Sequence, residues 1–200
     1  MANGMESAVE GSEVLVVGGG IAGCSAAYFL AKFGIRVTLL ERGEVAGEAS
    51  GLNAGSMGGL GWGNTPGLQE HLTMGSLEIF RQLELDMGYD IEFRRSGSMT
   101  AIHNETQYKY ASERLVALRS GGFSGELMTS REARSIEPGL NPDLPGYFYS
   151  PLRGQADPVK TTGALADAAG ACGAVIITRT EVKQVTYAGS SWLVETQERS

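Results

Sequence analysis

A short apolar run that breaks directly into a glycine-rich turn restricts the fold of this chain more than any other feature. Residues 14–17 are rich in β-branched side chains, as in a parallel strand that is buried on both faces. Glycines end that run, and over residues 21–33 apolar side chains recur at helical spacing until Gly34 stops the helix. Residues 36–41 again have the character of a strand. Strand, tight turn, helix and strand within roughly thirty residues predict a right-handed βαβ unit.

The turn itself fits the pattern G-x-G-x-x-G. Gly18 permits the tight turn off the strand, Gly20 lets the backbone approach a pyrophosphate, and Gly23 lets the helix pack close to the sheet. Ile21 and Ala22 complete the hexamer and begin the helix, whose N–H groups and partial positive charge favour phosphate oxygens. Such hexamers arise by chance in glycine-rich chains, but this one lies between a predicted strand and a predicted helix. We therefore interpret it as a dinucleotide-binding turn.

An acidic residue, Glu41, ends the second predicted strand. A carboxylate about 20 residues beyond the glycines can accept hydrogen bonds from ribose hydroxyls, and it repels a 2′-phosphate. An ordinary strand–helix turn and a solvated strand end are the less favoured explanation of the same residues. The combination indicates a dinucleotide with an unphosphorylated ribose in its ADP half, a half that NAD and FAD share.

Helix and strand signals continue along the rest of the chain. Thr65 and Pro66 begin a predicted helix whose apolar face, within residues 68–87, we expect in the core. Asp157 and Pro158 are an N-cap and first position for a later helix, and this role is favoured over a catalytic one for Asp157. The other expected elements are strands at 91–93, 98–102 and 174–177, helices at 105–118 and after the capping box of Thr129 and Glu132, and a hairpin at 181–187 and 192–196.

Charge and composition disfavour several classes of protein. The formal net charge of -7 argues against a nucleic-acid partner, which would require a basic patch. Two cysteines are too few for a disulfide scaffold, and no run approaches the roughly 20 apolar residues of a membrane span. The N-terminus resembles neither a signal peptide nor a transit peptide, so we expect a cytoplasmic protein with no membrane span.

A loop of small residues follows the second strand, where an NAD dehydrogenase would normally enter another helix. Residues 14–23, 40–43 and 49–55 resemble the D-amino acid oxidase and glycine/sarcosine oxidase family of flavoenzymes. Residues 155–158 with the following helix, 172–176 and 181–182 match the same family, and the similarity is loose over residues 66–150. This resemblance implies FAD as the cofactor. Together with the turn, it assigns cofactor contact to Gly18, Gly20, Ile21, Ala22, Gly23, Glu41, Arg42, Ser50, Asn53, Ala54, Gly55 and, through its backbone, Val182.

The same resemblance implies an α/β fold, a Rossmann-like FAD-binding domain with a parallel sheet. Residues 12–65 are expected to form its first part, residues 66–150 an inserted α+β segment of the substrate domain, and residues 151–200 the return helix, third parallel strand and hairpin. Family members continue beyond the hairpin, so we expect a fragment or truncated product. We also expect weak FAD binding and partial disorder after about Thr178.

Three histidine or cysteine side chains outside the turn receive structural interpretations. His71 and His103 are expected on the surface, and neither belongs to a metal-ligand spacing, so no metal site is predicted. Cys24 lies among small residues of the first helix and is expected to pack rather than react. The loop at 49–55 holds no histidine, which excludes covalent flavin attachment there. No catalytic residue is assigned.

The activity that the resemblance implies is oxidation of a small-molecule amino acid or secondary amine by hydride transfer to FAD. An FAD-dependent hydroxy-acid or glycerol-phosphate dehydrogenase, which can have a similar N-terminal pattern, stays open as an alternative. So does a non-catalytic FAD-binding fragment, or a subunit whose partner subunit supplies the missing parts.

Overall fold

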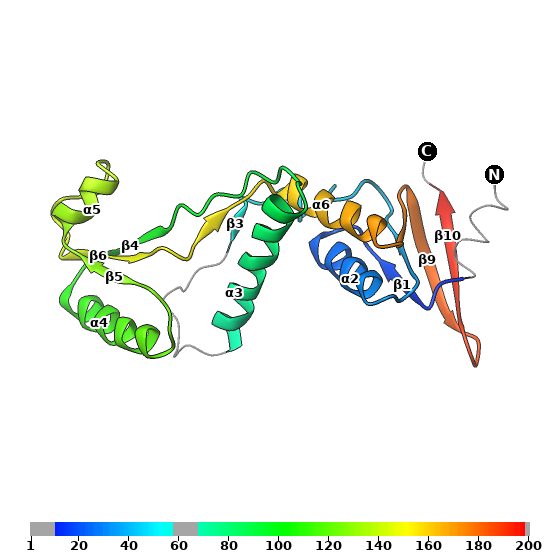
Figure 1. The fold of residues 1–200 in the computed structure, drawn as a ribbon, viewed down its shortest axis with the longest axis horizontal. Coiled ribbons are helices and arrows are strands. Elements are labelled where there is room, and N and C mark those ends of the chain that lie inside the picture. The colour runs from blue at the N-terminus through cyan, green and yellow to red at the C-terminus, as the bar shows by residue number, and fades with distance from the viewer. Residues whose placement is uncertain (1–10, 58–67, 199–200) are drawn as a thin grey trace. The chain divides into compact units, whose positions relative to one another are not determined.

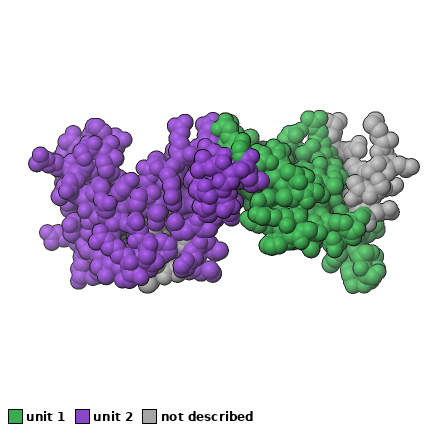
Figure 2. Space-filling view, viewed as in Figure 1, with its two compact units in different colours: residues 1–55, 88–91, 157–200 green, residues 56–87, 92–156 purple. Residues whose placement is uncertain are grey.

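The computed structural model describes residues 11–57 and 68–198 (Figure 1). The chain divides into two compact units, which Figure 2 colours separately. Unit 1 takes residues 1–55, 88–91 and 157–200, and unit 2 takes residues 56–87 and 92–156. Unit 1 is therefore assembled from both ends of the chain.

A three-stranded parallel sheet lies at the centre of unit 1. Its strands are β1 (Val14–Val17), β2 (Val37–Leu40) and β8 (Val175–Ile177), in the order β1-β2-β8. The predicted third parallel strand is thus confirmed. The expectation that β1 is buried on both faces was wrong, because β1 lies at an edge of this sheet and Val17 is 58% exposed. Every residue of the middle strand β2 is buried.

Two helices of small residues pack against each other in unit 1, namely α2 (Ile21–Lys32) and α6 (Pro158–Ala171). Buried alanines such as Ala27 and Ala168 let the two backbones approach closely. The Asp157 carboxylate accepts the Lys160 N–H at 2.8 Å, which confirms Asp157 as the N-cap of α6.

The predicted hairpin is also present. Strand β9 (Thr180–Tyr187) pairs antiparallel with β10 (Trp192–Glu198), with a register shift between Glu195 and Thr196. The Tyr187 and Trp192 rings face each other with centroids 5.0 Å apart. At the other end of the hairpin, the Thr180 N–H donates to the Glu41 carbonyl at 2.8 Å and ties β9 to the end of β2.

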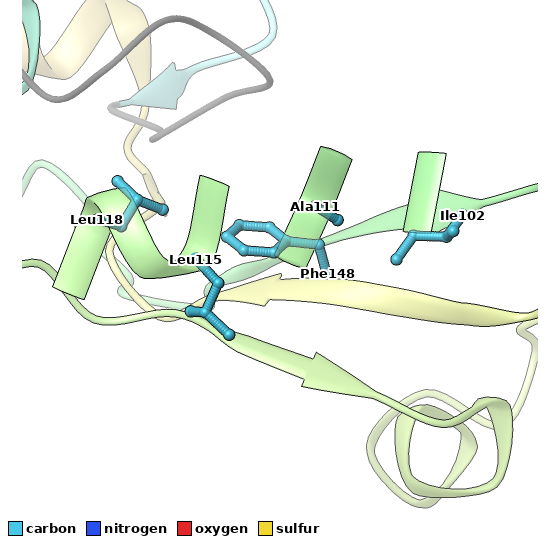
Figure 3. Close-up of a cluster of buried hydrophobic side chains, with 5 residues drawn as sticks. All are labelled: Ile102, Ala111, Leu115, Leu118 and Phe148. Carbon is cyan, nitrogen blue, oxygen red and sulfur yellow. The ribbon is translucent and has the colours of Figure 1, made fainter. Parts of the chain in front are cut away.

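Unit 2 contains an antiparallel sheet covered by a helix. Strands β4 (Ser98–Ile102), β6 (Gly146–Ser150) and β5 (Glu126–Met128) follow in the order β4-β6-β5, and α4 (Glu105–Ser120) packs against them. Figure 3 shows the buried cluster between the helix and the sheet, whose members are Ile102, Ala111, Leu115, Leu118 and Phe148. The β4 and α4 predictions are confirmed, while β5 and β6 were not predicted.

Shorter elements complete unit 2. Helix α5 (Ser130–Ile136) begins with the predicted capping box, because the Thr129 and Glu132 side chains each accept from the other residue's backbone N–H. Strand β3 (Ser56–Met57) pairs with β7 (Gly154–Gln155). The strand predicted at 91–93 was wrong, since only an isolated bridge forms next to it, between Arg94 and Gln155.

Helix α3 (Leu68–Arg81) continues into one turn of π-helix, η1 (Gln82–Asp86). The apolar face predicted for this segment is buried only in part, and Met87 at its C-terminal end is 40% exposed. Leu77 and Leu83 are 2% and 1% exposed, whereas Leu68 and Leu72 are 74% and 62% exposed. The expectation that Leu68 and Leu72 belong to the core was therefore wrong: helical spacing identifies an apolar side but not what covers it. The predicted start of this helix at residues 65–66 lies outside the described residues.

Candidate functional site

A cavity of about 390 Å³ opens in unit 1 at the carboxyl end of the parallel sheet. Its wall comes from four segments, of which the second and third are nearly continuous in sequence. They are the glycine turn 17–20, the end of β2 with Arg42, the loop 44–50 and the first residues of β9 up to Val182. Ligands of open α/β sheets bind at this end of the strands, so the cavity lies where the sequence predicts a dinucleotide.

The glycines of the turn are required for two different reasons, backbone conformation at Gly18 and lack of space at Gly20 and Gly23. Gly18 has a φ of 107°, a conformation that side-chain-bearing residues rarely adopt. A Cβ at Gly23 would lie 1.9 Å from the Gly18 carbonyl oxygen, and one at Gly20 would lie 2.9 Å from Ser50 Oγ. Gly23 therefore sets the close approach of α2 to the turn, as predicted, and Gly20 leaves the backbone bare at the cavity wall.

The carboxylate of Glu41 binds two backbone amides of the cavity wall. Its Oε2 accepts the Gly19 N–H at 2.6 Å, and its Oε1 accepts the Gly43 N–H at 2.7 Å. A Cβ at Gly19 would lie 2.9 Å from Glu41 Cγ, so this position also needs glycine. An ionised carboxylate has roughly four acceptor positions. Two of them are used here, which leaves acceptor capacity for ribose hydroxyls.

The loop that follows β2 is held against the glycine turn by hydrogen bonds. The Ala46 N–H donates to the Gly19 carbonyl at 3.0 Å, and the Ile21 N–H donates to Ser50 Oγ at 2.9 Å. Ala46 has a φ of 62°, an uncommon conformation for alanine and the kind of backbone strain that concentrates at ligand sites. The loop is thus fixed at two points beside the start of α2.

Charged side chains at the rim of the cavity are mostly paired with one another. Arg42 forms an ion pair with Glu48, and this hydrogen-bonded carboxylate raises the pKa of Arg42 above its ordinary value. Arg179 pairs with Glu44 at 2.8 Å. Carboxylates outnumber cations in the lining, so the start of helix α2, with its partial positive charge, is the feature suited to a pyrophosphate.

Cys24 lies beneath the turn and is completely buried. Burial, with a smaller contribution from the Glu41 carboxylate, raises the pKa of this thiol to about 11. Its Sγ is 3.5 Å from the Gly19 carbonyl oxygen. The expected packing role is confirmed, because a buried thiol that stays protonated is a poor nucleophile.

The structure brings only part of the predicted site together. Gly18, Gly20, Glu41, Arg42, Ser50 and Val182 line the cavity, and Ile21 adjoins it through its N–H group. Ala22 and Gly23 lie in the first turn of α2 outside the lining. Asn53, Ala54 and Gly55 also lie outside it: Asn53 accepts the Gly55 N–H at 2.8 Å and donates to the Ser50 carbonyl at 2.8 Å. Cofactor contact by these loop residues stays a prediction.

Sequence reasoning missed two residues that shape the cavity. Gly19 occupies a free position of the G-x-G-x-x-G pattern, and only the contact with Glu41 shows why glycine is needed there. Ala46 has no sequence signal, because alanine at a positive φ is not expected from composition or spacing.

No metal site is indicated in the described part of the chain. Within residues 11–57 and 68–198, no three side chains of the metal-binding types gather into a cluster. His71 instead packs edge-on against Phe123, with ring centroids 5.8 Å apart. No helix among these residues has the length and apolar character needed to cross a bilayer.

The cavity fits the ADP half of FAD by three observations. Three successive glycines leave the backbone accessible, the start of α2 adjoins the wall, and Glu41 presents acceptor oxygens beside the glycines. The glycines and the start of α2 match a pyrophosphate, and the Glu41 oxygens match a ribose.

Known proteins share the fold of this chain. The sequence model of the family described as FAD dependent oxidoreductase (DAO) matches residues 13–200. The crystal structure of glycine oxidase from Geobacillus kaustophilus superposes with a TM-score of 0.80 at 28% identity, over 92% of this chain and 51% of that chain.

Two curated relatives are named for functions other than glycine oxidation. Anaerobic glycerol-3-phosphate dehydrogenase subunit A1 of Haloferax volcanii is 32% identical over 88% of this chain and 29% of its own length. The mitochondrial pyruvate dehydrogenase phosphatase regulatory subunit of Mus musculus is 30% identical over 87% of this chain and 20% of its own length. The chain thus spans half or less of the length of the curated relatives that it matches. With the match over residues 13–200 and the fold of glycine oxidase, the chain belongs to the DAO family of FAD-dependent oxidoreductases.

Proposed function

We propose that the cavity of unit 1 binds the ADP half of FAD. The observation that carries this proposal is the pairing of a bare glycine turn with the Glu41 carboxylate on the wall of one cavity. The partially positive first turn of α2 and the Ser50 hydroxyl would hold the pyrophosphate. The Gly18, Gly19 and Ile21 N–H groups already donate to the Leu40 carbonyl, Glu41 Oε2 and Ser50 Oγ. Glu41 would accept the ribose hydroxyls, and the backbone at Val182 would meet the adenine. The next part of the loop would contact the cofactor nearer its flavin ring, through Asn53, Ala54 and Gly55.

For the whole protein, we propose oxidation of an amino acid or a secondary amine. The fold shared with glycine oxidase supports this substrate class. When bound, FAD supplies a hydride acceptor for the carbon that bears the amine, and water then hydrolyses the resulting imine. The residues described here contribute by orienting the cofactor.

Two alternatives have support from particular relatives. The similarity to a glycerol-3-phosphate dehydrogenase subunit supports oxidation of a hydroxyl-bearing carbon instead. The similarity to a phosphatase regulatory subunit supports a non-catalytic FAD-binding subunit that acts with a partner subunit.

Cofactor binding is tested by titrating the purified chain with FAD and with NADP⁺ while flavin fluorescence and heat release are recorded. We expect saturable binding of FAD and none of NADP⁺, whose 2′-phosphate would meet Glu41. Absence of FAD binding would contradict the proposal.

Substrate class is tested on the protein at its natural length. Oxygen uptake and dye reduction are measured with D-amino acids, sarcosine, 2-hydroxy acids and glycerol 3-phosphate. Turnover of an amine supports the main proposal, turnover of a hydroxyl compound the first alternative, and an FAD-loaded but inactive protein the second.

A further inference from the structure

Arg42 is the only basic side chain among the described residues that line the cavity of unit 1. The acidic side chains of the same lining are Glu41, Glu44, Glu48 and Glu181. An arginine forms strong, charge-assisted hydrogen bonds with phosphate oxygens. Arg42 is therefore the side chain of this wall that would attract an anionic ligand most.

Three of the acidic side chains have partners other than Arg42. The Glu41 carboxylate accepts two backbone N–H groups. Glu44 forms an ion pair with Arg179 at 2.8 Å, and Glu181 forms one with Lys183 at 2.9 Å. These partners do not belong to the cavity lining as cations, so the three carboxylates keep their contacts whether or not Arg42 is used by a ligand.

The fourth carboxylate, Glu48, binds the Arg42 guanidinium through Oε1 and Nη2. The pKa of Arg42 is raised, first by the hydrogen bond and charge of Glu48 and then by the charges of Glu181 and Glu41. The guanidinium is thus already held by a carboxylate on the wall of the same cavity. A phosphate oxygen and Glu48 Oε1 would compete for the same N–H groups.

The ion pair lies next to both groups that are assigned to the cofactor. Arg42 directly follows Glu41, the proposed ribose contact. Glu48 lies two residues before Ser50, whose hydroxyl binds the first residue of α2. The Glu48 carbonyl accepts the Gly51 N–H at 2.8 Å, which fixes the backbone at this position in a turn. The Glu48 carboxylate is therefore held close to the expected place of the phosphates.

We propose that Glu48 is a positioning residue that acts through Arg42, by competing with the cofactor phosphates for its guanidinium. This inference rests on the proposed FAD site. When the cofactor binds, Arg42 exchanges the Glu48 carboxylate for a phosphate oxygen, and Glu48 turns to solvent. Both side chains have the freedom to do so, since they are 50% and 69% exposed. The lost ion pair lowers the affinity, so Glu48 weakens the binding of phosphate-bearing ligands.

The central test is Glu48→Gln, which keeps the size of the side chain and removes its charge. We expect its affinity for ADP, measured by calorimetry, to rise about two- to fivefold, the range that corresponds to an exposed ion pair. Adenosine, which has no phosphate, should bind as it does to the parent chain. The gain should shrink as salt is added, because the screening length falls to roughly 3 Å at 1 M.

Glu44→Gln is the matched control. Glu44 lines the same cavity and is 61% exposed, but its partner is Arg179. This variant removes one negative charge from the wall without releasing Arg42, so it should raise ADP affinity less than Glu48→Gln does. Glu48→Asp, which keeps the carboxylate, should stay near the parent. Arg42→Gln should lower ADP affinity, and adding Glu48→Gln to it should bring no gain.

Three outcomes would overturn the inference while leaving the FAD site intact. They are an ADP affinity of Glu48→Gln no higher than that of the parent, an equal gain from Glu44→Gln, and a gain that persists without Arg42. A parent chain that binds neither ADP nor FAD would instead overturn the proposed function, and with it this inference.

Discussion

The Gly19 amide donates to Glu41 Oε2 at 2.6 Å, and the same carboxylate accepts the Gly43 amide through Oε1. Glu41 thereby joins the glycine turn to the chain that leaves β2. The carbonyl of Gly19 accepts the Ala46 N–H, so the backbone N–H and the carbonyl of Gly19 each form a hydrogen bond with the chain that follows β2. A residue assigned to ribose from the sequence also holds the phosphate turn in place.

The two roles of Glu41 predict a graded effect of its substitutions. Glu41→Ala removes the ribose acceptor and both amide contacts, so FAD affinity should fall by about 1.5 to 3 kcal/mol, the range for hydrogen bonds to a charged group. Glu41→Gln keeps one acceptor oxygen and should lose less. Calorimetric titration with FAD and ADP measures both variants. Equal affinities of Glu41→Ala and the parent would place the ribose contact elsewhere.

Gly20→Val should abolish FAD retention. Its Cβ would lie 2.9 Å from Ser50 Oγ, and its methyl groups would extend into the space at the start of α2. Flavin absorbance of the purified protein measures the effect.

Gly163→Ala is the matched control, since a Cβ at this position in α6 meets nothing within 4 Å. We expect this control to retain FAD and to gain about 0.5 to 1 kcal/mol of stability, as for glycine replaced by alanine within a helix. Retention of FAD by Gly20→Val at the parent level would contradict the assignment of the turn.

Local signals were sufficient for much of the fold. Asp157 and Thr129 are N-caps in the structure because capping depends only on residues two or three positions away. The third parallel strand was predicted from the family resemblance rather than from local signals, and the structure pairs it, as β8, with β2.

What the sequence could not provide were contacts between distant segments. Strand β6 was missed because its order arises from pairing with β4 and β5 on both sides. The exposure of Leu68 depends on what packs over α3, which periodicity does not encode. At the site, the contact of Ser50 with Ile21 and the positive φ of Ala46 arise from the way the loop folds back on the turn.

The two cysteines should differ in reactivity in the folded chain. Cys24 is buried and its pKa is raised to about 11, so at pH 8 its thiol stays protonated and shielded, whereas Cys172 is exposed. Iodoacetamide at pH 8 should therefore add one label, at Cys172, and a second only in denaturant. Peptide mass spectrometry identifies the sites. Equal labelling of both cysteines without denaturant would contradict the packing described around the turn.

The capping box of α5 predicts a pH dependence of stability in unit 2. Glu132 accepts from the Thr129 N–H and hydroxyl, each at 2.8 Å, and these bonds lower the pKa of Glu132 below its ordinary 4.5. A lowered folded-state pKa stabilises the fold above the unfolded-state pKa, and this stabilisation is lost as the pH falls through the folded-state value.

Glu132→Gln should therefore be less stable than the parent at pH 7, and the difference should shrink toward pH 3. Thr129→Ala, which removes the cap itself, should cost about 1 kcal/mol at pH 7. Urea unfolding followed by circular dichroism gives both comparisons, and a Glu132→Gln deficit that stays constant from pH 7 to pH 3 would show that the carboxylate charge does not act through this cap.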